Sequence, residues 1–318
     1  MLTLEMVRSA QSRIAPYVRR TRLERNSTLS DRFGTSIYLK LELFQKTGSF
    51  KSRGAINQIL VLDEAERRSG VVGVSGGNFA QGASYAGREL GIPVRICMAE
   101  GTPVNYVEAT RSYGAEVFFS PSIAEAFEQA RRFEGEGWSY IDPFAHPEMM
   151  AGNGTAGLEI LEDLPETTDV IVSIGGGGLI SGVVTALKGI KPAVRVWGVE
   201  TEGADVMARS LRAGEPVEMT PTSLARTLGA PFTSQFAFEQ VRDHVEEVLT
   251  ISDAEAFAAV GWFLERAKLV TELATGSTLA AARRLASRFG PDDHLVLLVC
   301  GGNVSLADLC SYREWFGL

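Results

Sequence analysis

The middle of the sequence reads Asp169-Val170-Ile171-Val172-Ser173-Ile174-Gly175-Gly176-Gly177-Gly178-Leu179-Ile180-Ser181-Gly182. The first six residues are mostly apolar, which predicts a buried strand, and the residues after the glycines have helical spacing. Backbone amides without side chains therefore meet the positive end of a helix, which is an arrangement that binds phosphate. Glycine costs up to ~1 kcal/mol in an ordered element, so this run favours close approach of the backbone to a ligand. We expect a phosphate site here.

A dinucleotide site is the main alternative for this turn. The next strand-like run, Val194–Val199, is followed by Glu200, close to the place expected for a ribose-binding carboxylate. The dinucleotide fingerprint needs glycines at positions i, i+2 and i+5. Counting from Gly175, Gly176 or Gly177, one required position holds Ile180, Ser181 or Leu179, respectively. The glycine pattern therefore argues against a dinucleotide.

A candidate nucleophile lies in the segment Thr47-Gly48-Ser49-Phe50-Lys51-Ser52-Arg53-Gly54. Before it, the run 37–43 alternates apolar and polar residues like a half-buried strand, and after it the run 55–60 has helical spacing. Lys51 is therefore expected at the end of an element. An amine screened from water there has a lowered pKa and can attack an aldehyde. A single lysine is more often a solvated surface charge, so this hypothesis depends on the other motifs.

Two other predicted strands end in glycine-containing turns. Leu295–Val299 leads to Cys300-Gly301-Gly302-Asn303, and Val71–Val74 leads to Ser75-Gly76-Gly77-Asn78-Phe79-Ala80-Gln81-Gly82. Open α/β sheets bind ligands at the carboxyl ends of their strands. We expect Cys300 to face a ring nitrogen there, and we expect the exposed amides of the second turn to bind a substrate carboxylate.

Together these motifs resemble the fold-type II pyridoxal-phosphate enzymes, specifically the branch of threonine and serine dehydratases and serine racemase, over nearly the whole chain. The resemblance implies that Lys51 is the Schiff-base lysine, that Phe50 packs beside the cofactor ring and that Asn78 is the partner of its 3-hydroxyl. It also implies that Gly175–Gly178 hold the phosphate. Cys300 takes the position beside the pyridine nitrogen, where the family commonly has serine, and a thiol is likewise a weak, uncharged partner.

The expected reaction is a pyridoxal-phosphate-dependent β-elimination. An uncharged partner at the ring nitrogen does not keep the ring protonated, which favours reactions in which charge leaves promptly through a β-substituent. The resemblance implies that the substrate amine displaces Lys51, which then removes the Cα proton while the β-hydroxyl leaves as water. Threonine or serine would thus give a 2-oxo acid and ammonia. A β-replacement synthase and a non-catalytic cofactor-binding protein are the alternatives.

Several positions depart from the family pattern and bear on the substrate. Arg226 lies where relatives usually have an Ala-Asp-Gly turn; it could pair with the distal carboxylate of a hydroxyaspartate, or it could form a surface ion pair. Phe79 replaces the usual histidine, which makes larger substrates such as phenylserine conceivable. Gly76 stands where racemases have a serine that reprotonates the second face, so racemisation is expected only in traces. Threonine or serine is the default substrate.

Two acidic residues have open roles in the sequence. Glu272 matches a glutamate that lines the cofactor pocket in relatives, and pocket wall and helix cap are equally compatible with its context. Glu200 and Ala204 match ligand positions of a divalent cation in some relatives, but Val206 occupies the place of the second carboxylate. Because hard cations prefer several oxygen ligands, no metal site is expected.

The predicted fold class is α/β, a two-lobed architecture like the tryptophan synthase β subunit, with parallel-rich sheets covered by helices. Strand-like runs alternate with helical runs between residues 70 and 146, which predicts a small mobile lobe there. Residues 1–69 and 147–318 are expected to form the large cofactor-binding lobe. Gly152-Asn153-Gly154 and Ser69-Gly70 are candidate hinges on composition.

Composition restricts the partners of the protein. The net charge of −8, with 31 basic and 39 acidic residues and no basic block, argues against nucleic-acid binding, and there is no apolar run long enough to span a bilayer. The three cysteines lack zinc-site spacing, and the amino terminus has no signal-peptide pattern. We therefore expect a cytoplasmic enzyme with a small amino-acid substrate, no membrane or nucleic-acid partner, and a homodimeric assembly.

Overall fold

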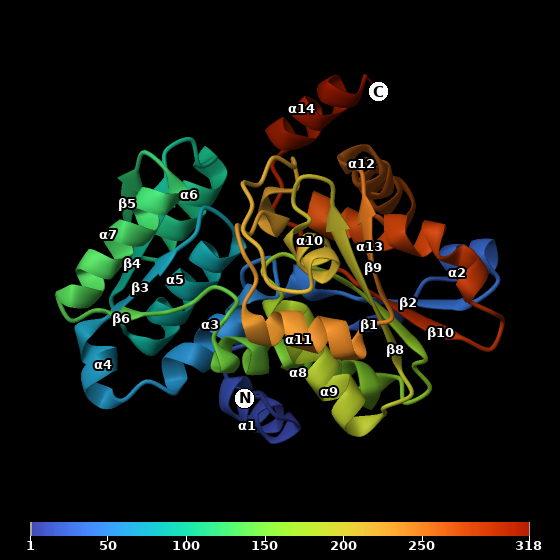
Figure 1. The fold of residues 1–318 in the computed structure, drawn as a ribbon, viewed down its shortest axis with the longest axis horizontal. Coiled ribbons are helices and arrows are strands. Elements are labelled where there is room, and N and C mark those ends of the chain that lie inside the picture. Colours follow the sequence, from blue (N-terminus) through green and yellow to red (C-terminus); the bar gives the residue numbers. More distant parts are fainter. Residues whose placement is uncertain (1, 318) are drawn as a thin grey trace.

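Two parallel-rich β-sheets form the framework of the computed structural model, which describes residues 2–317 (Figure 1). The larger sheet has the strand order β1 (Leu23–Arg25), β2 (Ser36–Lys40), β10 (His294–Leu298), β7 (Asp169–Ser173), β8 (Arg195–Thr201) and β9 (Glu247–Ile251). The smaller sheet has the order β5 (Glu116–Ser120), β4 (Val94–Ala99), β3 (Val71–Val74) and β6 (Ser139–Tyr140). All neighbouring strands are parallel except β1, which is antiparallel to β2. The predicted α/β class is confirmed.

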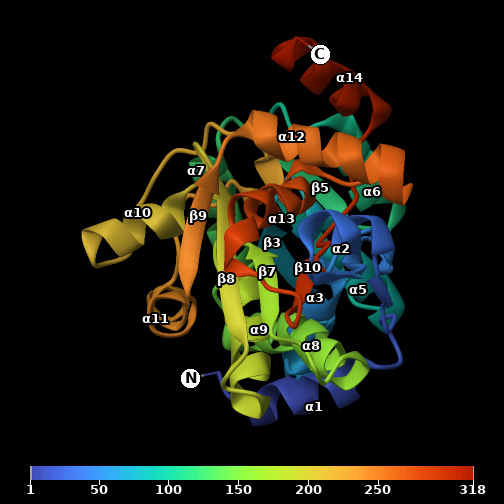
Figure 2. The same cartoon turned by 90° about the vertical axis from the view of Figure 1, so that its right-hand side faces the viewer.

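Helices surround both sheets, as the two views of Figures 1 and 2 show. In the first half of the chain they are α1 (Leu4–Ile14), α2 (Ser27–Phe33), α3 (Lys51–Leu60), α4 (Glu64–Ser69), α5 (Asn78–Leu90), α6 (Val104–Ser112), α7 (Ile123–Gly135) and α8 (Pro147–Asp163). In the second half they are α9 (Gly178–Ile190), α10 (Val206–Ala213), α11 (Gln235–His244), α12 (Asp253–Trp262), α13 (Leu273–Arg284) and α14 (Leu306–Phe316). Among residues 2–317, none of these helices has the length and apolar character that crossing a membrane requires.

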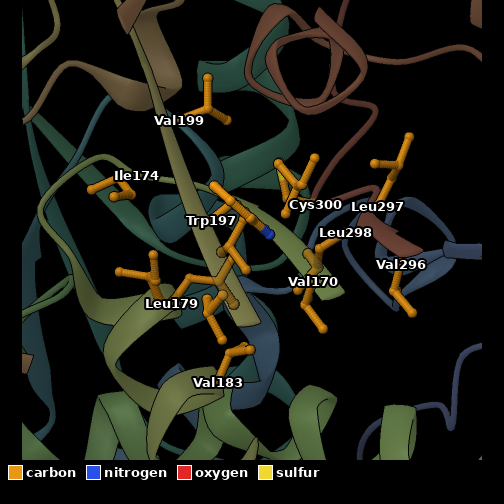
Figure 3. Close-up of a cluster of buried hydrophobic side chains, with 14 of the residues drawn as sticks. Val170, Ile174, Leu179, Val183, Trp197, Val199, Val296, Leu297, Leu298 and Cys300 are labelled. Carbon is orange, nitrogen blue, oxygen red and sulfur yellow. The ribbon is translucent and has the colours of Figure 1, made fainter. Parts of the chain in front are cut away.

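The larger sheet has a fully apolar centre. Side chains of β7, β8 and β10 meet those of α9 in the cluster of Figure 3, where Leu179 and Val183 lie beside Trp197. The indole nitrogen of Trp197 donates to Asp169 Oδ1 at 2.8 Å, so the one polar atom of this ring is satisfied. Parallel strands covered on both faces are expected to be apolar in their central residues, as these are. The carboxyl ends of these strands are therefore held by a close-packed core.

Helix α3 lies between the two sheets. It packs against α5, which covers the smaller sheet, and against α8, which belongs to the layer under the larger one. Ile56 and Ile59 of α3 are fully buried in the same apolar cluster as Ile96 and Met98 of β4. The element that begins at Lys51 therefore contacts both halves of the molecule. The division into a mobile lobe of residues 70–146 and a larger lobe stays a prediction.

Two predictions about local structure were wrong. The strand expected over 37–43 ends at Lys40, and a short 3-10 helix follows over Glu42–Phe44, because the carboxylate of Glu42 turns inward to bind Arg53. The candidate hinge at 152–154 lies inside α8, where a Cβ at Gly154 would approach Gly182 O at 2.6 Å, so its glycines permit close helix packing.

Candidate active site

A cavity of about 420 Å³ lies where the carboxyl ends of strands from both sheets meet. Strands β3, β4, β7 and β10 deliver Val74, Ala99, Ser173 and Cys300 to its wall. Every site residue that the sequence predicts lines this cavity: Phe50, Lys51, Ser75, Gly76, Gly77, Asn78, Phe79, Gly175, Gly176, Gly177, Gly178, Arg226 and Cys300. Five segments of the chain thus come together at the place expected for an open α/β sheet.

Lys51 lies at the first position of α3 with its amine in the cavity. Its Nζ donates to the backbone oxygen of Pro143 at 2.6 Å and lies 5.4 Å from the ring centre of Phe50 and 5.8 Å from that of Phe79. Burial lowers the pKa of this amine to about 8, although Asp142 acts in the opposite direction. Roughly a tenth of the Lys51 amine is therefore in the neutral, nucleophilic form at pH 7.

The glycine turn between β7 and α9 is shaped by the protein around it. A Cβ would come within 2.4 Å of the Phe144 ring at Gly176, and within 2.6 Å of Phe144 O at Gly178. Gly177 has φ +93°, and no side chain caps the start of α9. The glycines were predicted from close approach of a ligand, but packing against Phe144 already requires two of them. The turn still presents bare amides and a helix N-terminus to the cavity, which suits an anion.

The turn between β3 and α5 is more open. Ser75 Oγ accepts from the amide of Gly77 at 3.1 Å, and a Cβ at Gly77 would contact nothing nearer than a Thr227 methyl at 3.7 Å. At Gly76 a Cβ would lie 2.8 Å from the hydroxyl oxygen of Thr102, so Thr102 fills the space that a side chain there would occupy. The turn therefore combines an uncapped helix start with free volume, as a carboxylate site needs.

Phe79 does not widen the cavity in the way that the sequence suggested. Its side chain is only 2% exposed and belongs to the apolar cluster of the smaller sheet. The ring packs over Gly73, where a Cβ would lie 2.8 Å from it. Most of the ring is therefore core, and only part of it lines the cavity.

Asn78 and Glu272 form a buried pair at the cavity wall. Asn78 Nδ2 donates to Glu272 Oε1 at 2.9 Å and to Oε2 at 3.0 Å. Glu272 occupies the N-cap position of α13 without capping it, so of the two roles considered for it the pocket wall is the correct one. Burial raises the pKa of its carboxyl to about 7. Glu272 can therefore gain or lose a proton near neutral pH.

Cys300 provides an uncharged group at the end of β10. Its Sγ lies 3.4 Å from Ser173 Oγ and 3.3 Å from Thr275 Oγ1. Burial raises the pKa of the thiol to about 12, so it stays protonated. This is the electrostatic character that the sequence predicts for the residue beside a pyridine nitrogen.

Arg226 lies on a short 3-10 helix, Arg226–Leu228, and is exposed at the mouth of the cavity. No carboxylate among residues 2–317 forms an ion pair with it. It is one of two cationic side chains that line the cavity, the other being Lys51. A surface ion pair within the described part of the chain is therefore not its role.

The carboxylate of Glu200 binds backbone amides of the same chain. Its two carboxylate oxygens accept from the amides of Met207 at 2.9 Å and Ala208 at 2.8 Å, at the start of α10. Burial raises the pKa of this carboxyl to about 8. Asp205, the nearest other acidic side chain, is paired with Arg209 at 2.9 Å. Within residues 2–317 no group of three or more His, Cys, Asp or Glu side chains is arranged to hold a metal ion.

Residues 14–301 match the family model described as pyridoxal-phosphate dependent enzyme. The chain belongs to this family. It is 42% identical to an L-threonine ammonia-lyase of Thermotoga maritima over 96% of this chain and 77% of that protein, and 37% identical to an L-threo-3-hydroxyaspartate ammonia-lyase of Pseudomonas over 95% of each. The structure of maize serine racemase superimposes with a TM-score of 0.92 at 34% identity, covering 99% of this chain and 98% of that one.

The chain is a pyridoxal-phosphate-dependent ammonia-lyase of fold type II, as the sequence predicts. The cofactor supplies an electron sink for charge that develops at the substrate Cα. The cavity fits this group on three counts: an amine of lowered pKa for its aldehyde, an uncapped helix start for its phosphate, and a neutral thiol for its ring nitrogen. This family membership excludes the dinucleotide alternative.

Several groups that shape the cavity were not predicted from the sequence. Pro143 contributes only its backbone oxygen, which no residue pattern reveals. Thr102 follows the carboxyl end of β4, and the rule that such ends face the ligand could have identified it. Thr227 also lines the cavity, beside Arg226, and the prediction for this segment concerned only the charge of Arg226.

Proposed function

We propose that the chain converts threonine or serine to the corresponding 2-oxo acid and ammonia, with Lys51 as the group that carries the Cα proton. The observation that supports this most directly is the buried amine of Lys51, with a pKa of about 8, placed between two turns that suit anions. An amine that is partly neutral at neutral pH can accept a proton and return it.

The other site residues have proposed roles in holding the reactants. The amides of Gly175–Gly178 would hold the cofactor phosphate, Phe50 would pack beside the ring, and Asn78 would contact the 3-oxygen. The turn Ser75–Asn78 would hold the substrate carboxylate, since its helix start is uncapped and open to the cavity. Cys300 would face the ring nitrogen without charging it.

The test is a comparison of kcat/KM for 2-oxo-acid formation from both enantiomers of serine, threonine, 3-hydroxyaspartate and phenylserine. We expect L-threonine or L-serine to be the best substrate. Racemisation should stay a trace activity. If neither serine nor threonine yields an oxo acid while another compound does, this substrate assignment is wrong.

Hydroxyaspartate is the second candidate, and Arg226 favours it. The guanidinium stands at the cavity mouth without an ion-pair partner in the described chain, and one of the relatives is named for this substrate. A two-pronged contact between arginine and a carboxylate contributes about 1.5–3 kcal/mol, or roughly 10- to 100-fold in kcat/KM. Arg226→Gln should therefore lower kcat/KM for hydroxyaspartate by that factor and change the value for threonine less than about threefold. Arg212→Gln, at the exposed end of α10, is the matched control.

A homodimer in the cytoplasm is the proposed state of the protein. Exposed apolar side chains near the carboxyl terminus support an interface with a second copy: Leu264, Val270, Leu306 and Trp315 are 43 to 77% exposed. The free thiols of all three cysteines support a reducing compartment. Sedimentation equilibrium and cell fractionation test the two statements, and a monomer at micromolar concentration would contradict the first.

A further inference from the structure

Asn303 lies in the loop after β10 and binds two segments of the active site at once. Its Nδ2 donates to the backbone oxygen of Thr47 at 2.8 Å and to Asn78 Oδ1 at 2.8 Å. The side chain does not line the active-site cavity, so any effect on the cofactor passes through Asn78. Both hydrogens of the Asn303 amide have an acceptor, which defines the orientation of this amide.

The surroundings leave Asn303 no second conformation. Gly48 has φ +73°, and a Cβ there would lie 2.3 Å from Asn303 Oδ1, so the amide packs directly on that backbone. The backbone oxygen of Asn303 accepts from the hydroxyl of Tyr106 on α6, and the amide of Gly302 donates to Gly48 O at 2.9 Å. Asn303 is therefore held from its side chain, its backbone and the segment that precedes Lys51.

This constraint determines how Asn78 is oriented. Because its amide oxygen accepts from Asn303, its amide nitrogen must face Glu272 and the cavity. A flipped Asn78 would place its oxygen against the carboxylate of Glu272 and its nitrogen against the nitrogen of Asn303, and both contacts are unfavourable. Asn78 alone could rotate, whereas Asn78 bonded to Asn303 cannot.

We propose that Asn303 is a positioning residue for the cofactor, which acts by holding the amide nitrogen of Asn78 as a donor toward the cavity. The inference rests on the proposed contact between Asn78 and the 3-oxygen of pyridoxal phosphate. Asn78 and Tyr106 lie on helices that cover the smaller sheet, and Asn303 follows a strand of the larger one. The same side chain therefore joins both halves of the molecule at the cofactor site.

A double-mutant cycle on the full chain tests the proposal. The dissociation constant of pyridoxal phosphate is measured by fluorescence titration of the apoenzyme for wild type, Asn303→Ala, Asn78→Ala and the double variant. We expect Asn303→Ala to raise the dissociation constant about tenfold, as loss of a constrained hydrogen bond does. In the Asn78→Ala background the same change should raise it less than about twofold, because the two residues act through one contact.

Further variants separate positioning from folding. Asn303→Asp keeps the shape of the side chain but turns an acceptor toward Asn78. It should therefore raise the dissociation constant of pyridoxal phosphate at least as much as Asn303→Ala does. It should also shift the visible absorbance band of the bound cofactor. Ser305→Ala removes the hydroxyl that caps α14 two residues away while leaving the bonds of Asn303 in place, and it should change the dissociation constant less than about twofold. Melting temperatures verify that each variant is folded.

Two results would overturn the proposal in distinguishable ways. If Asn78→Ala weakens cofactor binding but Asn303→Ala and Asn303→Asp do not, or if Asn303→Ala has the same effect in both backgrounds, Asn303 does not act through Asn78. If Asn78→Ala itself leaves the dissociation constant unchanged, the proposed contact of Asn78 with the cofactor is wrong, and the inference about Asn303 is overturned with it.

Discussion

Lys51, whose amine lies in the cavity, and Arg53, which is fully buried, are two cations in the first turn of one helix, and their surroundings give them opposite chemistry. Lys51 has one backbone oxygen and two aromatic rings around its amine, and burial lowers its pKa to about 8. Burial also opposes the charge of Arg53, but Glu42 and Glu159 outweigh it and raise the pKa of the guanidinium above its usual range. A cation that is paired with carboxylates in the interior keeps its charge. An amine without such an ion pair has a lowered pKa and can react as a nucleophile.

Arg53 stabilises the fold through its contacts with two buried carboxylates. It donates to both oxygens of Glu42 at 2.7 and 2.8 Å and to both oxygens of Glu159 at 2.7 and 2.8 Å. Lys40 adds a second cation at 2.6 Å from Glu159, so two positive and two negative side chains form a balanced, fully buried network. This network fixes the start of α3 and with it the direction of Lys51.

The largest expected effect is that of replacing Lys51 on the rate of elimination. Lys51→Ala should lower the rate of elimination by at least ~10⁴-fold, because the proposed proton carrier and the proposed anchor of the cofactor aldehyde are both lost. The melting temperature of the apoenzyme should stay within about 2 °C of wild type or rise, since no ion pair is broken. Lys46→Ala, an exposed lysine in the same segment, is the control. Residual activity above 1% of wild type would contradict the role of Lys51.

The next largest effect is that of replacing Arg53 on the free energy of unfolding. Arg53→Met should lower the free energy of unfolding by about 3–5 kcal/mol, because Glu42 and Glu159 lose their main partner while buried. Urea denaturation measures this, with Arg22→Met as the control, since Arg22 forms an exposed pair with Glu24 and should cost less than about 1 kcal/mol. If both changes cost the same, the buried network does not hold the start of α3.

The pH dependence of Lys51 gives a smaller effect. Only the neutral amine attacks an aldehyde, and a pKa of about 8 makes that form roughly a tenth of the total at pH 7 and most of it at pH 9. The rate at which the apoenzyme captures pyridoxal phosphate should therefore rise roughly tenfold between these pH values and then level off. A rate that still increases steeply up to pH 10 would mean that the amine behaves like a solvated lysine.

The smallest expected effect is that of replacing Asp142, the acidic residue that most opposes the lowering of the Lys51 pKa. Asp142 is the strongest of the charges that raise the pKa of Lys51, so Asp142→Asn should lower the pH midpoint of cofactor capture by less than about one unit. Asparagine can still accept hydrogen bonds from the amides of Phe144 and Ala145, as Asp142 does, so the local loop is preserved. An upward movement of the midpoint would show that Asp142 acts on Lys51 through structure rather than charge.

The sequence predicted strands and site residues well where the signal was local. β3 agrees with the predicted run Val71–Val74, and all of the predicted site residues line one cavity. The failures came from long-range contacts. Gly152-Asn153-Gly154 looked like a hinge, but Gly152 packs against Arg53 and Gly154 against Gly182. Phe79 lines the cavity as predicted, but most of its ring packs over Gly73 in the core. A glycine or an aromatic ring has the same sequence signal in both settings, because the partner that decides its role lies far away in the chain.

The sequence by itself determined the chemistry that is possible: one lysine between a predicted strand and helix, glycine turns at strand ends, and a thiol where the family has a hydroxyl. Only the tertiary structure decided which cation is reactive, since burial lowers the pKa of Lys51, whereas Glu42 and Glu159 keep the charge on Arg53. It also decided that Glu272 and Asn303 meet at Asn78. Hydrogen bonds and desolvation act over a few ångströms, and those distances exist only after the chain has folded.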